Sequence, residues 1–193
     1  MGFLSVLSQA QRWVKERAQP GDAVVDATAG NGSDTLFLAR TVGAGGTVYA
    51  FDIQAEALGK THERLVAASG EQGNLAPVRL IHGGHEAMES VLDQQLHGRI
   101  AAIMFNLGYL PGASTDVITK PTTTVAALDS ALRLLRSGGA LTVVVYPGHD
   151  GGQEEASAVE AWASDVPSSL AQAILYRFPQ KAASPYLIAL NKK

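Results

Sequence analysis

Residues 24–35 constrain the fold of this chain more than any other stretch. An apolar run ends there in an acid, which is followed by a glycine-rich turn and then by a helical pattern. A strand, turn and helix of this kind hold a nucleotide-like ligand against the start of the helix. A second apolar run, 47–51, ends in Asp52, about twenty residues after the turn, where a ribose-binding carboxylate is needed. Together these features predict an α/β fold with a cofactor cleft.

The alternation of apolar runs and amphipathic segments continues along the chain. Alternation of this kind predicts a parallel sheet with crossover helices on both faces. The last two runs are joined by a linker too short for a helix, which predicts an antiparallel hairpin. A seven-stranded, mostly parallel sheet ending in such a hairpin is typical of the class I methyltransferase architecture, whereas the dinucleotide-binding Rossmann fold continues βαβ to its end. The expected helices are 3–17, 33–41, 54–68, 85–92, 122–135 and 153–163, and the expected strands are 23–26, 47–51, 77–82, 100–105, 140–146, 171–178 and 186–191.

Composition sets outer limits on the function. The length of 193 residues and the hydrophobic content of 46% predict one domain over 1–193, with a core of about 20–193 behind the N-terminal helix. We expect a cytoplasmic protein without a membrane partner, because neither a membrane-spanning run nor a secretory signal is seen. The lack of cysteine excludes disulfides and thiolate chemistry. A net charge of −3 argues against broad nucleic-acid coating but leaves room for a local basic patch.

The spacing within the glycine-rich turn helps to identify the ligand. Gly30 and Gly32 let the backbone pass close to it, and the following helix offers N–H groups to a phosphate or to the carboxylate of S-adenosylmethionine. The third glycine of the dinucleotide fingerprint is missing. Asp34 would repel a pyrophosphate, but it could pair with an amino-acid ammonium, or simply complement the helix dipole. Asp26 could contact the same ammonium or orient the loop.

Two further loops are expected to border the nucleoside part of the ligand. Asp52 can accept hydrogen bonds from both ribose hydroxyls, and the adjacent Ile53 and Gln54 can flank the nucleoside. The loop after the third strand carries His85 and Glu86. These two side chains could lie beside the adenine or could cap the helix that follows.

The segment 104–112 follows the fourth predicted strand and carries the most specific chemical signal. It resembles the Asn-Pro-Pro-Tyr element of amino methyltransferases, in which the asparagine oxygen and a main-chain carbonyl accept hydrogen bonds from the substrate amine. Asn106 holds the corresponding position, and Tyr109 could stack on a planar base. Alternatively, Asn106 caps backbone groups and Tyr109 packs in a turn.

The loop after the next strand could supply the proton acceptor. An aliphatic amine is protonated at neutral pH and must lose a proton before it attacks, so His149 or Tyr146 could act as a base or relay. A loop histidine also commonly serves as a structural hydrogen-bond donor. We expect no metal, because His82, His85 and His149 lack a ligand spacing.

Taken together, the segments 26–35, 51–54, 106–112, 120–124 and 146–149 resemble the rRNA methylase family, and the resemblance spans about residues 20–190. It points to the MnmM-type tRNA methyltransferases. It implies methylation of the 5-aminomethyl group of the wobble uridine, which is often 2-thiolated, giving 5-methylaminomethyluridine. The implied cofactor is S-adenosylmethionine, with S-adenosylhomocysteine as product, and the implied partner is a tRNA anticodon stem-loop. A second subunit, in a homodimer, could complete the basic surface.

The resemblance also implies roles for particular positions. Asn31, Gly32, Ser33, Asp34, Asp52, Gln54, His85 and Glu86 would surround the cofactor, and 106–111 and His149 would face the amine. When the residues inferred from the loop motifs are added to those implied by the resemblance, the expected cofactor site consists of Asp26, Thr28, Gly30, Asn31, Gly32, Ser33, Asp34, Thr35, Asp52, Ile53, Gln54, Gly84, His85, Glu86 and Asn106. The expected catalytic residues are Asn106, Tyr109, Tyr146 and His149, and the expected substrate contacts are Leu107, Gly108, Leu110, Pro111 and Lys120.

The loop 178–186 departs from the family pattern, because it lacks an asparagine near position 179 or 180 and a Pro-Pro pair. The departure bears on tRNA contacts more than on methyl transfer. Two alternative functions would use the same cleft. The protein could be an rRNA or small-molecule N-methyltransferase, or it could be a nonenzymatic cofactor-binding module. The amine motif at Asn106 counts against the module, for which mutation of that residue would leave the biological role intact.

Overall fold

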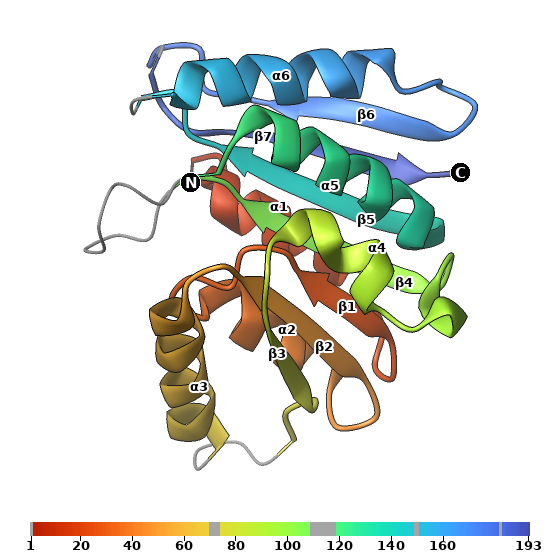
Figure 1. The fold of residues 1–193 in the computed structure, drawn as a ribbon. Helices are drawn as coiled ribbons and strands as arrows, with labels where there is room; N and C mark the ends of the chain where they lie inside the picture. Colours follow the sequence, from red (N-terminus) through yellow and green to blue (C-terminus); the bar gives the residue numbers. More distant parts are fainter. Residues whose placement is uncertain (1, 70–73, 109–118, 149–150, 182) are drawn as a thin grey trace.

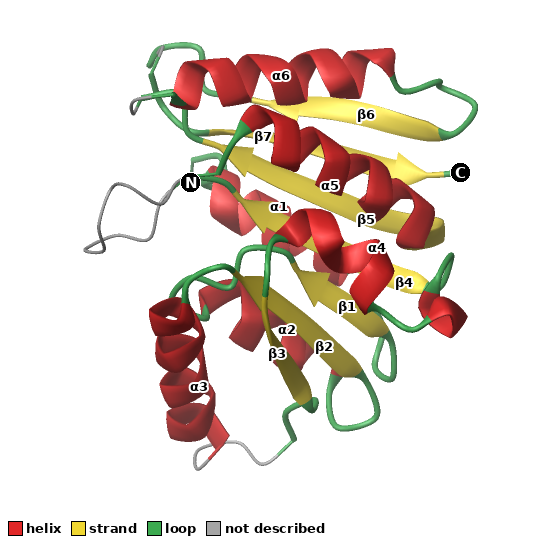
Figure 2. Ribbon diagram, viewed as in Figure 1, coloured by secondary structure: helices red, strands yellow, loops and turns green. Residues whose placement is uncertain are grey.

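The computed structural model describes residues 2–69, 74–108, 119–148, 151–181 and 183–193. They form a seven-stranded sheet with helices on both faces (Figure 1), and Figure 2 shows the same view coloured by secondary structure. The strands are β1 (Ala23–Asp26), β2 (Thr47–Asp52), β3 (Val78–His82), β4 (Ile100–Asn106), β5 (Leu135–Val145), β6 (Ala171–Tyr176) and β7 (Tyr186–Lys192). The α-helices are α1 (Val6–Lys15), α2 (Ser33–Val42), α3 (Ala55–Ser69), α4 (Met88–Val91), α5 (Pro121–Leu134) and α6 (Gly152–Asp165).

The strand order is β3-β2-β1-β4-β5-β7-β6. Strand β7 pairs antiparallel with both β5 and β6, while the other paired strands run parallel, which confirms the predicted mostly parallel sheet and its C-terminal antiparallel hairpin. The direction of winding reverses between β1 and β4. Ligands of open α/β sheets bind beyond the carboxyl ends of the strands at such a switch point.

Two hydrophobic cores cover the two faces of the sheet. In β4, Ile103 and Phe105 point into one core, with α4, α5 and α6, whereas Met104 points into the other, with α1 and α2. The alternation follows from the two-residue period of a strand. Because both faces are covered, β4 is buried over Ile100–Phe105, and this explains its uninterrupted apolar sequence. Figure 1 shows α5 and α6 in front of the sheet and α1 and α2 behind it.

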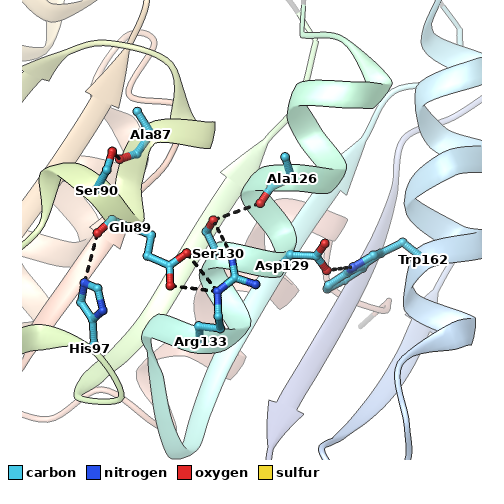
Figure 3. Close-up of polar contacts among 9 residues, drawn as sticks. All are labelled: Ala87, Glu89, Ser90, His97, Ala126, Asp129, Ser130, Arg133 and Trp162. Carbon is cyan, nitrogen blue, oxygen red and sulfur yellow. Dashed lines mark hydrogen bonds and ion pairs between the residues drawn. The ribbon is translucent and has the colours of Figure 1, made fainter. Parts of the chain in front are cut away.

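Polar contacts tie α5 to both of its neighbours (Figure 3). The Nε and Nη2 atoms of Arg133 donate to the Glu89 carboxylate of α4, with distances of 2.7–2.9 Å. On the other side, Trp162 Nε1 of α6 donates to Asp129 Oδ1 at 2.8 Å. The hydrogen bond from Arg133 is the main cause that lowers the pKa of Glu89. Such surface contacts add little stability, but they fix how α4, α5 and α6 lie on the sheet.

Two elements differ from the sequence-based expectation. The predicted helix 85–92 is a 3₁₀ turn over His85–Ala87 followed by the single turn α4. Strand β5 begins at Leu135 rather than at residue 140, because the buried Leu135 pairs with Ile100 before the register shifts. Gly138, with φ of 77°, allows the chain to turn within this irregular stretch.

Gly32 at the start of α2 provides a test of the turn geometry. Its φ is 78°, and a Cβ atom added there would lie 2.8 Å from the Thr61 Cα atom. We expect Gly32→Ala to lower the free energy of unfolding by about 2–4 kcal/mol, since backbone strain and overpacking add. Urea unfolding measures this. Gly59→Ala is the matched control, because a Cβ at this exposed position in α3 meets no atom within 4 Å. It should be slightly stabilising, and equal effects of the two changes would contradict the prediction.

Candidate active site

A cavity of about 630 Å³ lies at the carboxyl ends of β1, β2, β3, β4 and β5. Four loops supply most of its wall, with additions from the start of α5 and from one face of α1. The lining residues are Leu7, Gln11, Ala27, Thr28, Ala29, Gly30, Asn31, Ser33, Asp34, Asp52, Ile53, Gln54, Gly83, Gly84, His85, Glu86, Asn106, Leu107, Gly108, Thr119, Lys120, Thr123 and Tyr146. The cavity therefore occupies the switch point that the topology marks.

Two aspartates at strand ends hold the glycine-rich turn. Asp26 accepts hydrogen bonds from Thr35 Oγ1 at 2.6 Å and from Thr28 N at 3.1 Å. Asp52 accepts from Gly30 N and from Gln54 N, both at 2.9 Å. Each oxygen of Asp52 keeps a second acceptor direction, because a carboxylate oxygen carries two lone pairs. Asp52 can thus support the turn and bind a ligand at the cavity wall at once.

Asp26 and Asp34 form an interacting pair of carboxylates at the turn, with Asp26 buried beneath it and the half-buried Asp34 lining the cavity. Burial, and next the charge of Asp34, raise the pKa of Asp26 from 3.8 to about 7. Burial also raises the pKa of Asp34, although the hydrogen bond from Gln11 Nε2, at 2.9 Å, opposes this shift. Among the described residues, neither carboxylate forms a salt bridge. A cationic ligand group beside Asp34 would therefore favour the ionised form of the pair.

The raised pKa of Asp26 predicts a pH dependence of stability. Because the folded-state value of about 7 exceeds the ordinary 3.8, the protonated carboxyl is favoured in the folded protein. Its stabilising contribution is complete below pH 3.8 and is lost as the pH rises through 7. We expect the thermal unfolding midpoint of the ligand-free protein to fall, relative to that of Asp26→Asn, as the pH rises from about 4 to about 8. Parallel pH profiles of the two proteins would contradict this assignment.

Asn106 lies at the end of β4, where its backbone N–H donates to Thr28 Oγ1 at 2.7 Å. Its side-chain Oδ1 is buried and has no hydrogen-bond partner within the part of the chain that the structure describes. Buried carbonyl oxygens are nearly always paired, so this atom fits the N–H donor of a ligand. Burial, and next the charge of Asp34, raise the pKa of Tyr146, and hydrogen bonding from the Asn106 side chain lowers it. The two side chains form one polar group at the cavity wall.

His85 lines the cavity and carries a second buried atom without a partner among the described residues. The ring packs edge-on against Phe105, with centroids 5.5 Å apart, and Nε2 is buried without a partner among the described residues. Burial is the main cause that lowers the pKa of His85, so the imidazole is neutral near neutral pH. A neutral ring with one free nitrogen can exchange hydrogen bonds with a heterocyclic base.

The structure brings together most of the predicted site residues. Lining the cavity are Thr28, Gly30, Asn31, Ser33, Asp34, Asp52, Ile53, Gln54, Gly84, His85, Glu86, Asn106, Leu107, Gly108, Lys120 and Tyr146. Asp26, Gly32 and Thr35 do not line it. Asp26 and Thr35 bond to each other beneath the turn, and Gly32 packs on Thr61. Tyr109, Leu110, Pro111 and His149 lie outside the described residues.

Several wall residues were not predicted. Leu7 and Gln11 come from α1, where their spacing of four residues places both on one helix face. Thr119 and Thr123 lie close in sequence to the predicted Lys120, and Ala27, Ala29 and Gly83 complete the loops. The helical spacing in α1 was the only signal available for Leu7 and Gln11, and it does not say which face meets the sheet.

No group of three or more His, Asp or Glu side chains in the part of the chain that the structure describes could hold a metal ion. None of the helices within the described ranges is long and apolar enough to cross a membrane.

Comparison with known proteins places this geometry in context. The family described as "Putative rRNA methylase" matches residues 48–192. A protein of Arabidopsis thaliana named "tRNA (mnm(5)s(2)U34)-methyltransferase, chloroplastic" is 39% identical over 180 residues. The match covers 91% of this chain but only 65% of that relative, so the chain spans about two thirds of its length.

Solved structures match over the whole chain. The crystal structure of a "putative rRNA-methylase" from Clostridium thermocellum is 37% identical, with a TM-score of 0.92 and complete coverage of both chains. A "putative methyltransferase" from Streptococcus mutans, solved in complex with S-adenosylhomocysteine (SAH), is 32% identical, with a TM-score of 0.87 and again complete coverage of both. The observed sheet is thus that of a class I methyltransferase.

Proposed function

This chain belongs to the rRNA methylase family, and from that premise we propose that it is an S-adenosylmethionine-dependent N-methyltransferase. Its proposed substrate is the 5-aminomethyl or 5-aminomethyl-2-thio group of the wobble uridine of tRNA, and its product is the 5-methylaminomethyl nucleoside. The observation that carries this proposal is the buried, unpartnered Oδ1 atom of Asn106 at the cavity wall. A carbonyl oxygen in that position suits an amine donor.

The residues around the cavity fit the chemical groups of the cofactor. Asp34 accepts a hydrogen bond from Gln11 but forms no salt bridge among the described residues, so its carboxylate suits the ammonium group of the cofactor. Asp52 suits the ribose hydroxyls, and His85 suits the adenine. When bound, S-adenosylmethionine supplies a methyl group that is already activated by the positive charge on its sulfur. The chain is therefore left with the tasks of binding, orientation and handling of the proton.

Asn106 orients the amine nitrogen by accepting its N–H through Oδ1, so that the nitrogen lone pair is directed at the methyl carbon. Thr28, in the turn that follows the neighbouring strand β1, fixes the Asn106 backbone. Tyr146 keeps its proton at neutral pH, because the ordinary tyrosine pKa of 10.0 is raised further here by burial, and it acts as a hydrogen-bond donor or as part of a relay. His149 is proposed as the proton acceptor because it follows the end of β5 by four residues in the sequence.

The tRNA substrate is supported by the name of the Arabidopsis relative. Lys120 at the cavity wall is a cation available to an RNA phosphate, although the whole chain carries a net charge of −3. RNA recognition of this kind depends on shape and on stacking of a single-stranded base as well as on charge. We propose that the protein acts on the anticodon loop with the wobble base turned out of its stack.

The test is transfer of a labelled methyl group from S-adenosylmethionine to tRNA that carries 5-aminomethyluridine, followed by mass analysis of the nucleosides. We expect a gain of one methyl group on the wobble nucleoside alone. Unmodified tRNA and rRNA are the matched controls. Methylation of rRNA instead would favour the substrate in the family description, and cofactor binding without any transfer would contradict the proposed substrate.

A further inference from the structure

Glu155 is a buried carboxylate that the proposed chemistry does not use. It lies in the first turn of α6, and only 3% of its surface is exposed. Its two oxygens accept hydrogen bonds from Thr119 Oγ1 and Thr124 Oγ1, each at 2.6 Å. Among the described residues it forms no salt bridge. Burying a charge without a cationic partner costs free energy, and the hydrogen bonds from the two threonine hydroxyls offset much of that cost.

The contact through Thr119 continues to the substrate side of the cavity. Thr119 Oγ1, which donates to Glu155, accepts a hydrogen bond from Gly108 N at 3.1 Å. Thr119 N in turn donates to Gly108 O at 3.4 Å. Gly108 follows Asn106 by two residues, and Gly108, Thr119 and Asn106 all line the cavity. An unbroken chain of hydrogen bonds therefore joins the buried carboxylate to the backbone beside Asn106.

The second contact of Glu155 serves as an internal comparison. Thr124 is fully buried near the start of α5 and does not line the cavity. Its bond to Glu155 holds α5 against α6. The Thr124 contact can thus affect the stability of the helix pair, whereas the Thr119 contact also reaches the cavity wall.

We propose that Glu155 is a positioning residue for methyl transfer. Through Thr119 it fixes the Gly108 backbone, and with it the direction in which the Asn106 side chain and the following main-chain carbonyl face the substrate amine. A carboxylate suits this task because it accepts both hydroxyl protons, which leaves Thr119 Oγ1 free to accept from Gly108 N. The inference rests on the proposed function and deepens it.

The experiment compares Glu155→Gln with Glu154→Gln, an exposed neighbour in the same helix turn. In the Glu155 variant we expect kcat for tRNA methylation to fall by about 10- to 100-fold, because a small misplacement of reacting groups is costly. The Kd for SAH should stay close to that of the wild type. Hydrogen exchange at the Gly108 amide should become faster. The Glu154 variant should match the wild type in all three measurements.

Variants of the two threonines separate positioning from stability. Thr119→Val should lower kcat as Glu155→Gln does, and Thr119→Ser should recover much of the loss, because serine keeps the hydroxyl. Thr124→Val should lower the unfolding midpoint while leaving kcat nearly unchanged. This split between kcat and stability would not arise if Glu155 only held the two helices together.

The outcomes distinguish the inference from the proposed function. Wild-type protein that transfers no methyl group to tRNA contradicts the proposed function, and Gly108 exchange then still tests the hydrogen-bond chain. Active wild type with equal kcat and equal Gly108 exchange in the Glu155 and Glu154 variants overturns the positioning role. If Glu155→Gln does not fold, Thr119→Val decides: unchanged kcat and Gly108 exchange in that variant overturn the proposal.

Discussion

Asn106→Ala is expected to lower kcat for tRNA methylation by about 100-fold while leaving the Kd for SAH nearly unchanged. The loss follows because the variant lacks the buried Oδ1 that orients the amine, and orientation provides most of the catalysis when the methyl donor is already activated. The Asn106 backbone bond to Thr28 does not involve the side chain, so the end of β4 should stay in place. Single-turnover methylation of tRNA and calorimetric binding of SAH measure the two effects.

The control for this prediction is Asn191→Ala. Asn191 lies in β7, and its side chain donates to the backbone of Gly138 and Gly139, outside the cavity wall. Its removal should leave kcat unchanged. A loss of SAH binding in Asn106→Ala as large as the loss of turnover would contradict the assigned role, because it would show that Asn106 supports the cofactor rather than the substrate.

The sequence predicted the positions of the site residues best where apolar runs end. Asp52 and Asn106 each terminate a strand, and the carboxyl ends of parallel strands meet at one edge of a sheet. Most of the predicted residues that follow β1, β2, β3, β4 and β5 and that the structure describes therefore line one cavity.

Side-chain direction was harder to predict, since it depends on tertiary packing. Asp26 ends β1 as Asp52 ends β2, yet Asp26 points beneath the turn to Thr35, whereas Asp52 lines the cavity. The contribution of α1 through Gln11 depends on how that helix lies against α2, and no local pattern encodes this. Glu155 looks like an ordinary helix-dipole acid in the sequence. Its burial arises only when α6 packs against α5.

Asp52→Ala is expected to weaken SAH binding by about 100-fold. Two losses combine: the hydrogen bonds that the carboxylate offers to the ribose, and the support of the turn through Gly30 N and Gln54 N. A hydrogen bond to a charged group contributes about 1.5–3 kcal/mol, and each 1.4 kcal/mol corresponds to about a tenfold change in Kd. Once the cofactor is saturating, kcat should recover much of its value, because Asn106 is intact. This is the reverse of the pattern expected for Asn106→Ala.

Two further variants determine which of the losses dominates. Asp52→Asn keeps one acceptor oxygen, which can bond either Gln54 N or Gly30 N but not both, so its Kd should lie between those of the wild type and Asp52→Ala. Asp165→Ala removes an exposed acid at the end of α6 and controls for the change in net charge. If Asp52→Ala binds SAH as tightly as Asp165→Ala does, the carboxylate does not hold the ribose. The nucleoside would then have to be bound by the adjacent loop of Gly84, His85 and Glu86, which follows β3 and contacts Asp52 through the hydrogen bond from Gly83 N to Asp52 O.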